Sequence, residues 1–99
     1  MKVNNAMSSN NRNIWSRRLA FQAIYSWSIN NCNTDELYSI FKEDENFKKS
    51  DIDYFKNIIQ GVIDNISEIN QYITDSSEID IKNINYVELS ILRCFIYEL

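Results

Sequence analysis

The chain has 99 residues, enough for one small domain, with 44% hydrophobic residues and a formal net charge of −4. It contains one glycine, no proline and no histidine. This composition excludes histidine-based catalytic triads, histidine-ligated zinc and glycine-rich phosphate loops, and it favours long helices joined by polar links.

The charges are divided unevenly along the chain. Residues 1–34 carry four basic side chains and no acidic one, whereas residues 35–99 carry six basic side chains and all fourteen acidic ones. The first segment therefore has a charge of +4 and the second a charge of −8. A basic segment in an otherwise acidic protein predicts a contact with a polyanion.

The N-terminal segment and the cysteines bear on the compartment. Residues 1–13 are polar and lack the apolar stretch of a signal peptide, and no other run approaches the roughly 20 apolar residues of a membrane span. Cys32 and Cys94 lie outside any CxxC motif, so we expect small apolar thiols rather than a disulfide or a metal site. These features predict a cytoplasmic protein without a membrane partner.

The first predicted helix runs from about Asn13 to Asn30, where apolar residues recur every three or four positions. One stripe is expected to face a core and consists of Trp15, Leu19, Ala20, Ala23, Ile24 and Trp27. A second side carries further apolar residues, Ile14, Phe21, Tyr25 and Ile29. Because a simple surface helix needs only one apolar stripe, part of this second side is expected to meet a partner.

A second, shorter helix is predicted from Thr34 to Phe41. Asn33 or Thr34 can cap it, and acidic residues follow at once in the first turn, where they suit the positive end of the helix dipole. The charged stretch of residues 42–49 is predicted to be a loop.

The clearest apolar pattern begins after Ser50, a predicted N-cap. Its members alternate spacings of three and four and are Ile52, Phe55, Ile59, Val62, Ile66, Ile69 and Ile73. Gly61 lies among them, and a helix glycine costs about 1 kcal/mol relative to alanine. Either another helix crosses closely at Gly61, which we favour, or the segment kinks and splits near Asn65.

The last predicted helix begins near Asn85, after a polar link at residues 74–80. It carries the apolar residues Val87, Ile91, Leu92, Phe95, Ile96 and Leu99, and its final turn is still apolar on its inner face. No capping residue follows Leu99, so we expect a segment that normally follows this helix to be absent. The sequence thus predicts an all-α fold, a small bundle of about five helices, with residues 1–13 as a flexible basic arm and residues 14–99 as the helical domain.

Two carboxylate pairs, Glu43 with Glu45 and Asp51 with Asp53, are the remaining candidates for acid–base catalysis. They fall in a predicted loop and at a helix start, where solvated charges and dipole partners are the more ordinary interpretation. We therefore expect no catalytic residue, no metal and no cofactor.

Recognition chemistry has better candidates. Arg17 and Arg18, with Arg12 earlier on the same segment, place guanidinium groups near Trp15. Single-stranded RNA contacts use this combination of charge and aromatic surface. Solvated arginines and a core tryptophan are the alternative interpretation of the same residues.

Three motifs resemble the NusB family. The segment from Ser16 to Trp27 reads S-R-R-L-A-F-Q-A-I-Y-S-W and is similar to the family pattern A-R-E-x-A-x-Q-x-L-Y-x-W. Asp53-Tyr54-Phe55 with Gly61-Val62 is similar to the family pattern D-x-x-Y/F-F followed by G-V. The run from Val87 to Arg93 with Tyr97-Glu98-Leu99 is similar to the family pattern V-E-R-A-I-L-R followed by Y-E-L. The motifs keep the family order and cover residues 16–99.

The resemblance implies a NusB-type helical bundle that is not an enzyme. It implies a transcription antitermination factor that pairs with NusE, a ribosomal protein of the small subunit. The pair would bind single-stranded boxA RNA in ribosomal RNA leaders and act on RNA polymerase with other Nus factors. Family members continue through two further helices, which this chain lacks, and the resemblance leaves a homodimer open.

The resemblance also assigns an RNA surface. Arg17 matches the arginine of the family's basic motif, and Lys2 and Arg12 belong to the same basic arm. Arg18 stands where the family usually has glutamate and joins them as a fourth expected RNA contact. The arm is thinner in arginine than is usual for the family, which predicts a weaker electrostatic contact.

The expected contacts with NusE come from the same resemblance. Tyr25 and Glu88 match residues that family members use against NusE, and Ile29 lies one turn beyond Tyr25 on the same side. Without the resemblance, Tyr25 would be an ordinary half-buried helix residue and Glu88 a first-turn carboxylate.

Two other functions stay open on the sequence alone. The chain could be the NusB-like RNA-binding module of a ribosomal RNA cytosine methyltransferase, which requires a large catalytic domain downstream. It could also be an inactive fragment that serves only as a helical protein-interaction domain, without salt-sensitive RNA affinity. Helix-turn-helix DNA binding is disfavoured because no basic recognition helix follows a short turn.

Overall fold

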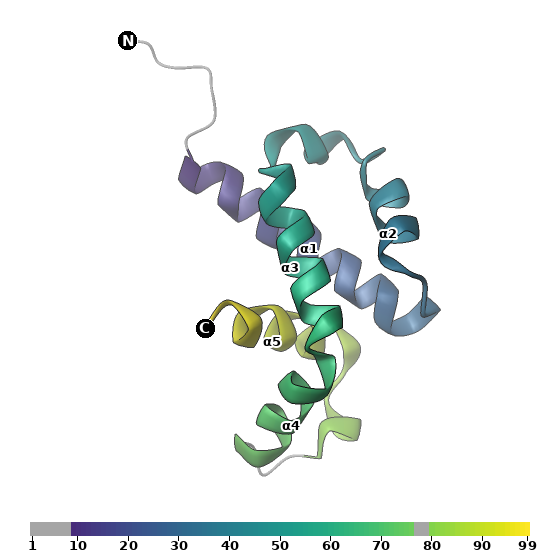
Figure 1. The fold of residues 1–99 in the computed structure, drawn as a ribbon, viewed down its shortest axis with the longest axis vertical. Helices are drawn as coiled ribbons and strands as arrows, with labels where there is room; N and C mark the ends of the chain where they lie inside the picture. The colour runs from purple at the N-terminus through teal and green to yellow at the C-terminus, as the bar shows by residue number, and fades with distance from the viewer. Residues whose placement is uncertain (1–8, 77–79) are drawn as a thin grey trace.

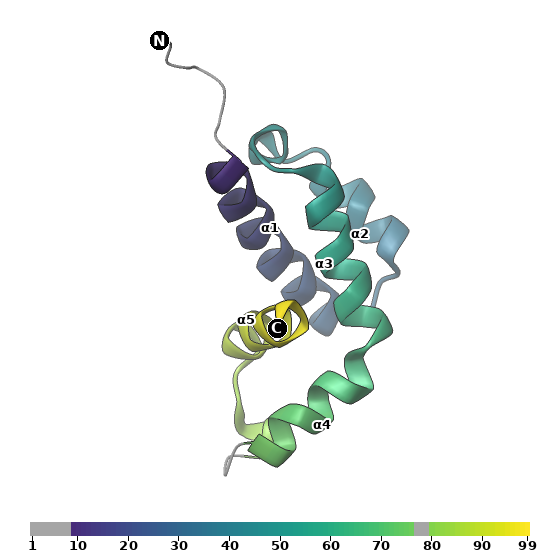
Figure 2. The same cartoon turned by 60° about the vertical axis from the view of Figure 1, so that its left-hand side comes forward.

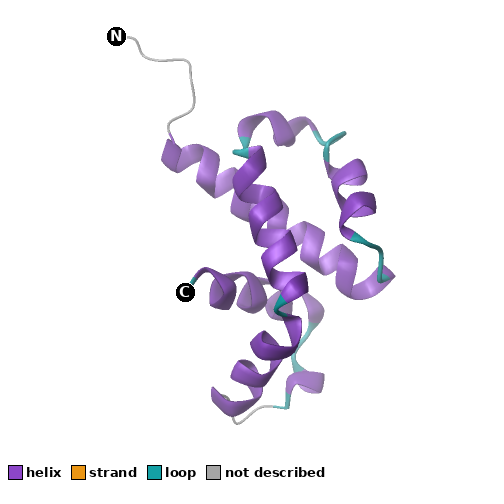
Figure 3. Cartoon of the chain, in the orientation of Figure 1, coloured by secondary structure: helices purple, strands orange, loops and turns teal. Residues whose placement is uncertain are grey.

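A computed structural model describes residues 9–76 and 80–99, and every regular element in this part of the chain is a helix (Figures 1 and 3). The elements are α1 (Ser9–Asn30), α2 (Thr34–Phe41), the 3₁₀ helix η1 (Glu45–Lys49), α3 (Ile52–Asp64), α4 (Ile66–Ser76), the 3₁₀ helix η2 (Ile81–Asn83) and α5 (Tyr86–Glu98). The predicted all-α bundle of about five helices is confirmed. None of the described helices is long and apolar enough to cross a lipid bilayer.

Helix α1 is the longest element and packs against both α3 and α5. Helix α2 and η1 lead the chain from the end of α1 back to its beginning, where α3 starts (Figure 1). Helix α4 continues from α3 in a new direction, and α5 returns to lie beside α1 and α3 (Figure 2). Residues far apart in the sequence therefore meet along α1.

The core lies mainly between α1 and α3. These two helices contribute Leu19, Ala20, Ala23 and Ile24 from α1 and Phe55, Ile58, Ile59 and Val62 from α3, and Leu37 on α2 and Cys94 on α5 are buried in the same core. The predicted seam is thus largely confirmed, but Ile52 is 38% exposed because it lies in the first turn of α3, beside the exposed cap residue Asp51. Trp15 and Trp27, at the two ends of the predicted α1 stripe, are half-buried.

Two boundaries differ from the prediction. Helix α1 begins at Ser9, four residues before the predicted start at Asn13. The prediction missed these residues because a polar Asn/Ser segment gives no periodic apolar signal. The stretch of residues 42–49, predicted as a loop, contains η1 and buries Phe47. The Phe47 ring meets the Phe55 ring edge-to-face at a centroid distance of 5.6 Å. Phe47, the aromatic residue in an otherwise polar and charged segment, thus packs this segment against the core.

The caps follow the predicted chemistry, with one correction. Asn33 caps α2 and forms a capping box with Glu36, and Asn85 caps α5. Ser50, however, does not cap α3, because the side chain of Asp51 accepts the hydrogen bond from the Tyr54 amide at 3.1 Å. The Ser50 hydroxyl instead donates to the Phe47 carbonyl at 2.7 Å and closes η1.

Both expectations for Gly61 are met. Helix α5 crosses α3 at Gly61, where a Cβ atom would overlap the ring of Tyr97, so the favoured close packing is confirmed. The segment also splits at Asn65, whose side-chain amide donates to the Gly61 carbonyl at 2.8 Å and ends α3. The glycine at the helix crossing and the residue that ends α3 are therefore joined by a hydrogen bond.

Most of the apolar residues that the last helix carries are exposed. The residues of α5 that are buried are Leu89, Ser90, Arg93 and Cys94, whereas Val87, Ile91, Leu92, Phe95 and Leu99 are exposed. Helix α5 is apolar on more than one side, so its periodicity does not identify the side that meets the core. Its exposed apolar residues form surface instead.

Candidate functional site

The first half of α1 carries a basic surface. Arg12 and Arg18 are exposed, and the Arg18 guanidinium lies 5.1 Å from the centroid of the Trp15 ring. Lys49, from η1, places its Nζ atom 4.8 Å from the same ring. Two cations from different elements therefore lie close to the Trp15 ring, which gives a mixed aromatic and charged surface.

Arg17 points to a different set of partners. Its Nε atom donates to Glu98 Oε1 at 3.2 Å, and its guanidinium lies 5.5 Å from the centroid of the Tyr54 ring. The Tyr54 hydroxyl donates a hydrogen bond to the other oxygen of Glu98. The expected RNA contact of Arg17 is thus engaged within the protein, while Arg12 and Arg18 face solvent.

The electrostatics of this trio follow from its geometry. Burial alone would lower the pKa of Arg17, but the negative charge of Glu98 and the neighbouring Tyr54 outweigh it and raise the pKa. Burial, together with the hydrogen bond to Glu98, raises the pKa of Tyr54 above its usual value of 10.0. The arginine therefore stays charged and the tyrosine stays protonated at neutral pH.

The expected partner-binding residues lie farther along α1 and at the start of α5. Tyr25 is 39% exposed and Ile29 50% exposed, and Glu88 is exposed in the first turn of α5. A groove of about 370 Å³ runs between the two helices and is lined by Phe21, Gln22, Tyr25, Val87, Ser90 and Ile91. Tyr25 thus lines an apolar groove. Glu88 directly follows Val87, which also lines this groove.

Sequence reasoning missed several members of these surfaces. Lys49 and Glu98 carry no motif that links them to α1, because only the fold brings residues so distant in sequence together. The sequence marks Val87 and Ile91 only as apolar residues of the last helix, and they line the groove. Lys2, which is also one of the four expected RNA contacts, lies outside the described residues.

The carboxylate pairs do not assemble into a site. Glu43, Glu45, Asp51 and Asp53 are all exposed, and Asp51 caps α3. No group of three or more potential metal ligands gathers within residues 9–76 and 80–99. Cys94 is buried and Cys32 is half-buried, and both are free thiols.

Together these features define a small all-helical domain with a basic surface on α1 and an apolar groove between α1 and α5. The model of the NusB family matches residues 15–99, and the chain belongs to the NusB family.

Relatives named "Transcription antitermination protein NusB" agree with this assignment. The one from Coxiella burnetii (strain Dugway 5J108-111) is 39% identical over 83 residues, which cover 84% of this chain and 60% of the relative. The one from Colwellia psychrerythraea is 34% identical over the same shares of both chains. The one from Xanthomonas axonopodis pv. citri is 29% identical, with 52% of its length covered. The chain therefore spans about 60% or less of the length of these relatives.

Proposed function

We propose that this chain is an RNA-binding transcription antitermination factor that pairs with the ribosomal protein NusE on boxA RNA of ribosomal RNA leaders and suppresses premature termination. The observation that carries the proposal is the division of α1 into two surfaces. The basic surface near Trp15 has the chemistry of an RNA contact, and the groove beside Tyr25 has the chemistry of a protein contact. Neither surface requires catalysis, a metal or a cofactor.

The RNA contact uses the cations that solvent can reach. Arg12, Arg18 and Lys49 are exposed, and the charged groups of the last two lie 5.1 and 4.8 Å from the centroid of the Trp15 ring. Guanidinium groups bind phosphate oxygens in pairs, and the aromatic ring offers a surface for a base. Lys2 belongs to the same basic segment and adds to this contact.

The NusE contact uses the groove and its rim. Tyr25 supplies an amphipathic side chain of the kind that dominates protein interfaces, and Ile29 extends the apolar surface by one helical turn. Glu88 adds a carboxylate at the α5 end of the groove, and its charge favours a basic partner. Other Nus factors and RNA polymerase are reached through this complex.

The test is a binding titration of the full chain with single-stranded boxA RNA, with and without purified NusE, across a salt series. The three contacts of Arg12, Arg18 and Lys49 predict a slope of log affinity against log salt of about −2, and Lys2 as a fourth contact would make it about −3, because each contact on single strands contributes about −0.7. Arg18→Gln should reduce the slope by about 0.7. Lys56→Gln removes the same charge from the exposed side of α3 and should leave the slope unchanged.

Tyr25→Ala tests the partner surface separately. It should abolish the effect of NusE and leave the RNA affinity of the chain alone intact. Tyr72→Ala, on α4, removes a tyrosine that is more exposed than Tyr25 and lies away from the groove, and it should leave the NusE effect in place. RNA affinity that is independent of salt, or that does not change with NusE, would overturn the proposal.

A further inference from the structure

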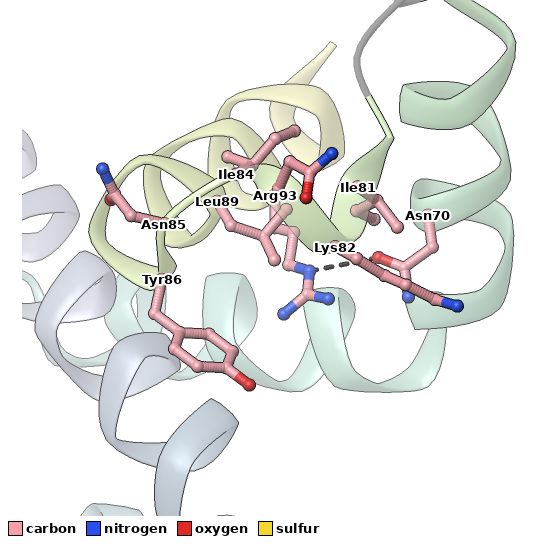
Figure 4. A pocket seen from close by; sticks show the side chains of 9 residues that line it. Asn70, Ile81, Lys82, Ile84, Asn85, Tyr86, Leu89 and Arg93 are labelled. Carbon is pink, nitrogen blue, oxygen red and sulfur yellow. Dashed lines mark hydrogen bonds between the residues drawn. The ribbon is translucent and has the colours of Figure 1, made fainter.

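A second cavity lies on the other side of α5. It has a volume of about 530 Å³ and lies between α4, η2 and the start of α5. Figure 4 shows its lining residues grouped around the guanidinium of Arg93, with Asn70 on one side and Tyr86 on the other. The cavity shares no lining residue with the α1–α5 groove or the basic surface of α1.

Arg93 is the unusual member of this cavity. It is only 9% exposed, and its hydrogen bonds go to neutral partners, from Nε to Asn70 Oδ1 and from Nη1 to Ser28 Oγ, both at 3.1 Å. The one ion pair among the described residues joins Arg17 to Glu98, so no described carboxylate neutralises Arg93. Burial lowers the pKa of this guanidinium, which reflects the loss of water around an unbalanced charge.

A buried charge is expensive unless an opposite charge accompanies it. An arginine has five N–H donors, and the two hydrogen bonds to Asn70 and Ser28 use two of them. The remaining donors match the paired oxygens of a phosphate or carboxylate. Lys82 adds a second cation to the lining, and Asn85 places the N-terminus of α5 there.

The rest of the lining sets the size and character of a ligand. Ile81, Ile84 and Leu89 provide apolar walls, and Tyr86 provides an aromatic ring. The volume falls within the range of about 300–1,000 Å³ that is usual for small-molecule sites, and it exceeds what a bare anion fills. The cations suit a phosphate group, and the apolar and aromatic walls suit an organic group attached to it.

We infer that this cavity binds a nucleoside phosphate, with the phosphate group on Arg93 and Lys82 and the nucleoside against Tyr86 and the isoleucine walls. The ligand is either a free nucleotide or one nucleotide unit of an RNA strand. The site does not depend on the antitermination role, because its residues are separate from both surfaces of α1.

The direct test is NMR titration of the ¹⁵N-labelled full chain with AMP, UMP, inorganic phosphate and adenosine. The nucleotides should shift the amide signals of Asn70, Lys82 and Tyr86 saturably, phosphate should do so more weakly, and adenosine should not. A trinucleotide RNA distinguishes the sources. If the trinucleotide binds more tightly than AMP, the ligand of the cavity is a nucleotide unit of an RNA strand. If it binds equally or more weakly, the ligand is a free nucleotide.

Variants make the test specific. Arg93→Gln removes a link between three helices and carries a risk of unfolding, so Asn70→Asp is the better change. It places a carboxylate beside the Arg93 guanidinium, which should weaken AMP binding at least about tenfold and raise Tm. Lys82→Gln should weaken binding about threefold, whereas Lys56→Gln, with the same loss of charge, should not.

The outcomes that overturn the inference are equally direct. Absence of saturable shifts around Arg93 with AMP and UMP would remove the site, whatever the result of the boxA titration. Unchanged AMP affinity in a folded Asn70→Asp variant would show that Arg93 does not hold the phosphate. Loss of NusE-dependent boxA binding with intact AMP binding would instead overturn only the proposed function.

Discussion

The contact between Gly61 and Tyr97 gives a sharp test of how α5 crosses α3. A methyl group at position 61 would overlap the Tyr97 ring, whose hydroxyl donates to Asn57 Oδ1 at 2.9 Å. Gly61→Ala should therefore force the ring to move, although alanine is the better helix former. The two effects have opposite signs, and their sizes decide the outcome.

The magnitude follows from three contributions. Alanine in a helix interior stabilises by about 1 kcal/mol relative to glycine. Overpacking costs about 1–3 kcal/mol, and displacing Tyr97 loses a hydrogen bond of about 1 kcal/mol. The exposed end of Tyr97 allows partial relief, so we expect Gly61→Ala to destabilise the fold by about 1 kcal/mol. For a domain of this size, that change lowers Tm by about 4–8 °C.

A double-mutant cycle measures the contact itself. Urea unfolding of the wild type, Gly61→Ala, Tyr97→Ala and the double variant gives the coupling free energy. In the Tyr97→Ala background, Gly61→Ala should stabilise by about 1 kcal/mol, because only helix propensity remains. Tyr97→Phe keeps the ring but removes the hydroxyl, so the effect of Gly61→Ala in that background should lie between its effects in the wild type and in Tyr97→Ala. Stabilisation by Gly61→Ala in the wild type, or the same sign in both backgrounds, would refute the close crossing.

Three further predictions concern the thiols and the Arg17 contact. Burial raises the pKa of Cys94 to about 12, so iodoacetamide at pH 8 should label Cys32 and leave Cys94 unmodified until the chain unfolds. The folded state holds this thiol proton more tightly than the unfolded state, so its contribution to stability is complete below about pH 9 and is lost as pH rises toward 12. Urea titrations should show the free energy of unfolding falling by up to about 1.4 kcal/mol per pH unit over this range. The Cys94→Ala variant should not show this fall. Glu98→Gln should free Arg17, raise boxA affinity two- to threefold in the salt titration and change stability by less than about 1 kcal/mol.

Local features of the fold could be predicted because local chemistry determines them. Asn33 and Asn85 cap helices through their own side chains and the next turn of backbone, so a short segment of sequence contains the whole interaction. The α3 core residues follow a helical period for the same reason. Ser50 shows the limit of this reasoning, because Asp51 is an equally good cap one position later.

Tertiary features could not be predicted in this way. The hydrogen bond between Arg17 and Glu98 joins residues 81 positions apart, and no periodic pattern connects them. Arg93 is an even clearer case, because an arginine in an apolar helix is ordinarily assigned to the surface. Here α5 turns Arg93 and Cys94 inward and leaves Phe95 62% exposed. The choice between the two sides of α5 depends on what α1 and α4 offer, which the sequence of α5 does not contain.

The two surfaces of α1 have a consequence for how RNA and NusE would influence each other. Trp15 and Tyr25 are ten residues apart on one continuous helix, which corresponds to about 15 Å along its axis. The helix core between them is fully buried at Leu19, Ala20 and Ala23, so it cannot change its length or direction cheaply. If the proposed function holds, we expect cooperativity between the two ligands to arise from contacts that RNA and NusE make with each other when bound side by side, rather than from a rearrangement of α1. On this argument, binding either ligand alone leaves the amide signals at the other end of α1 in place.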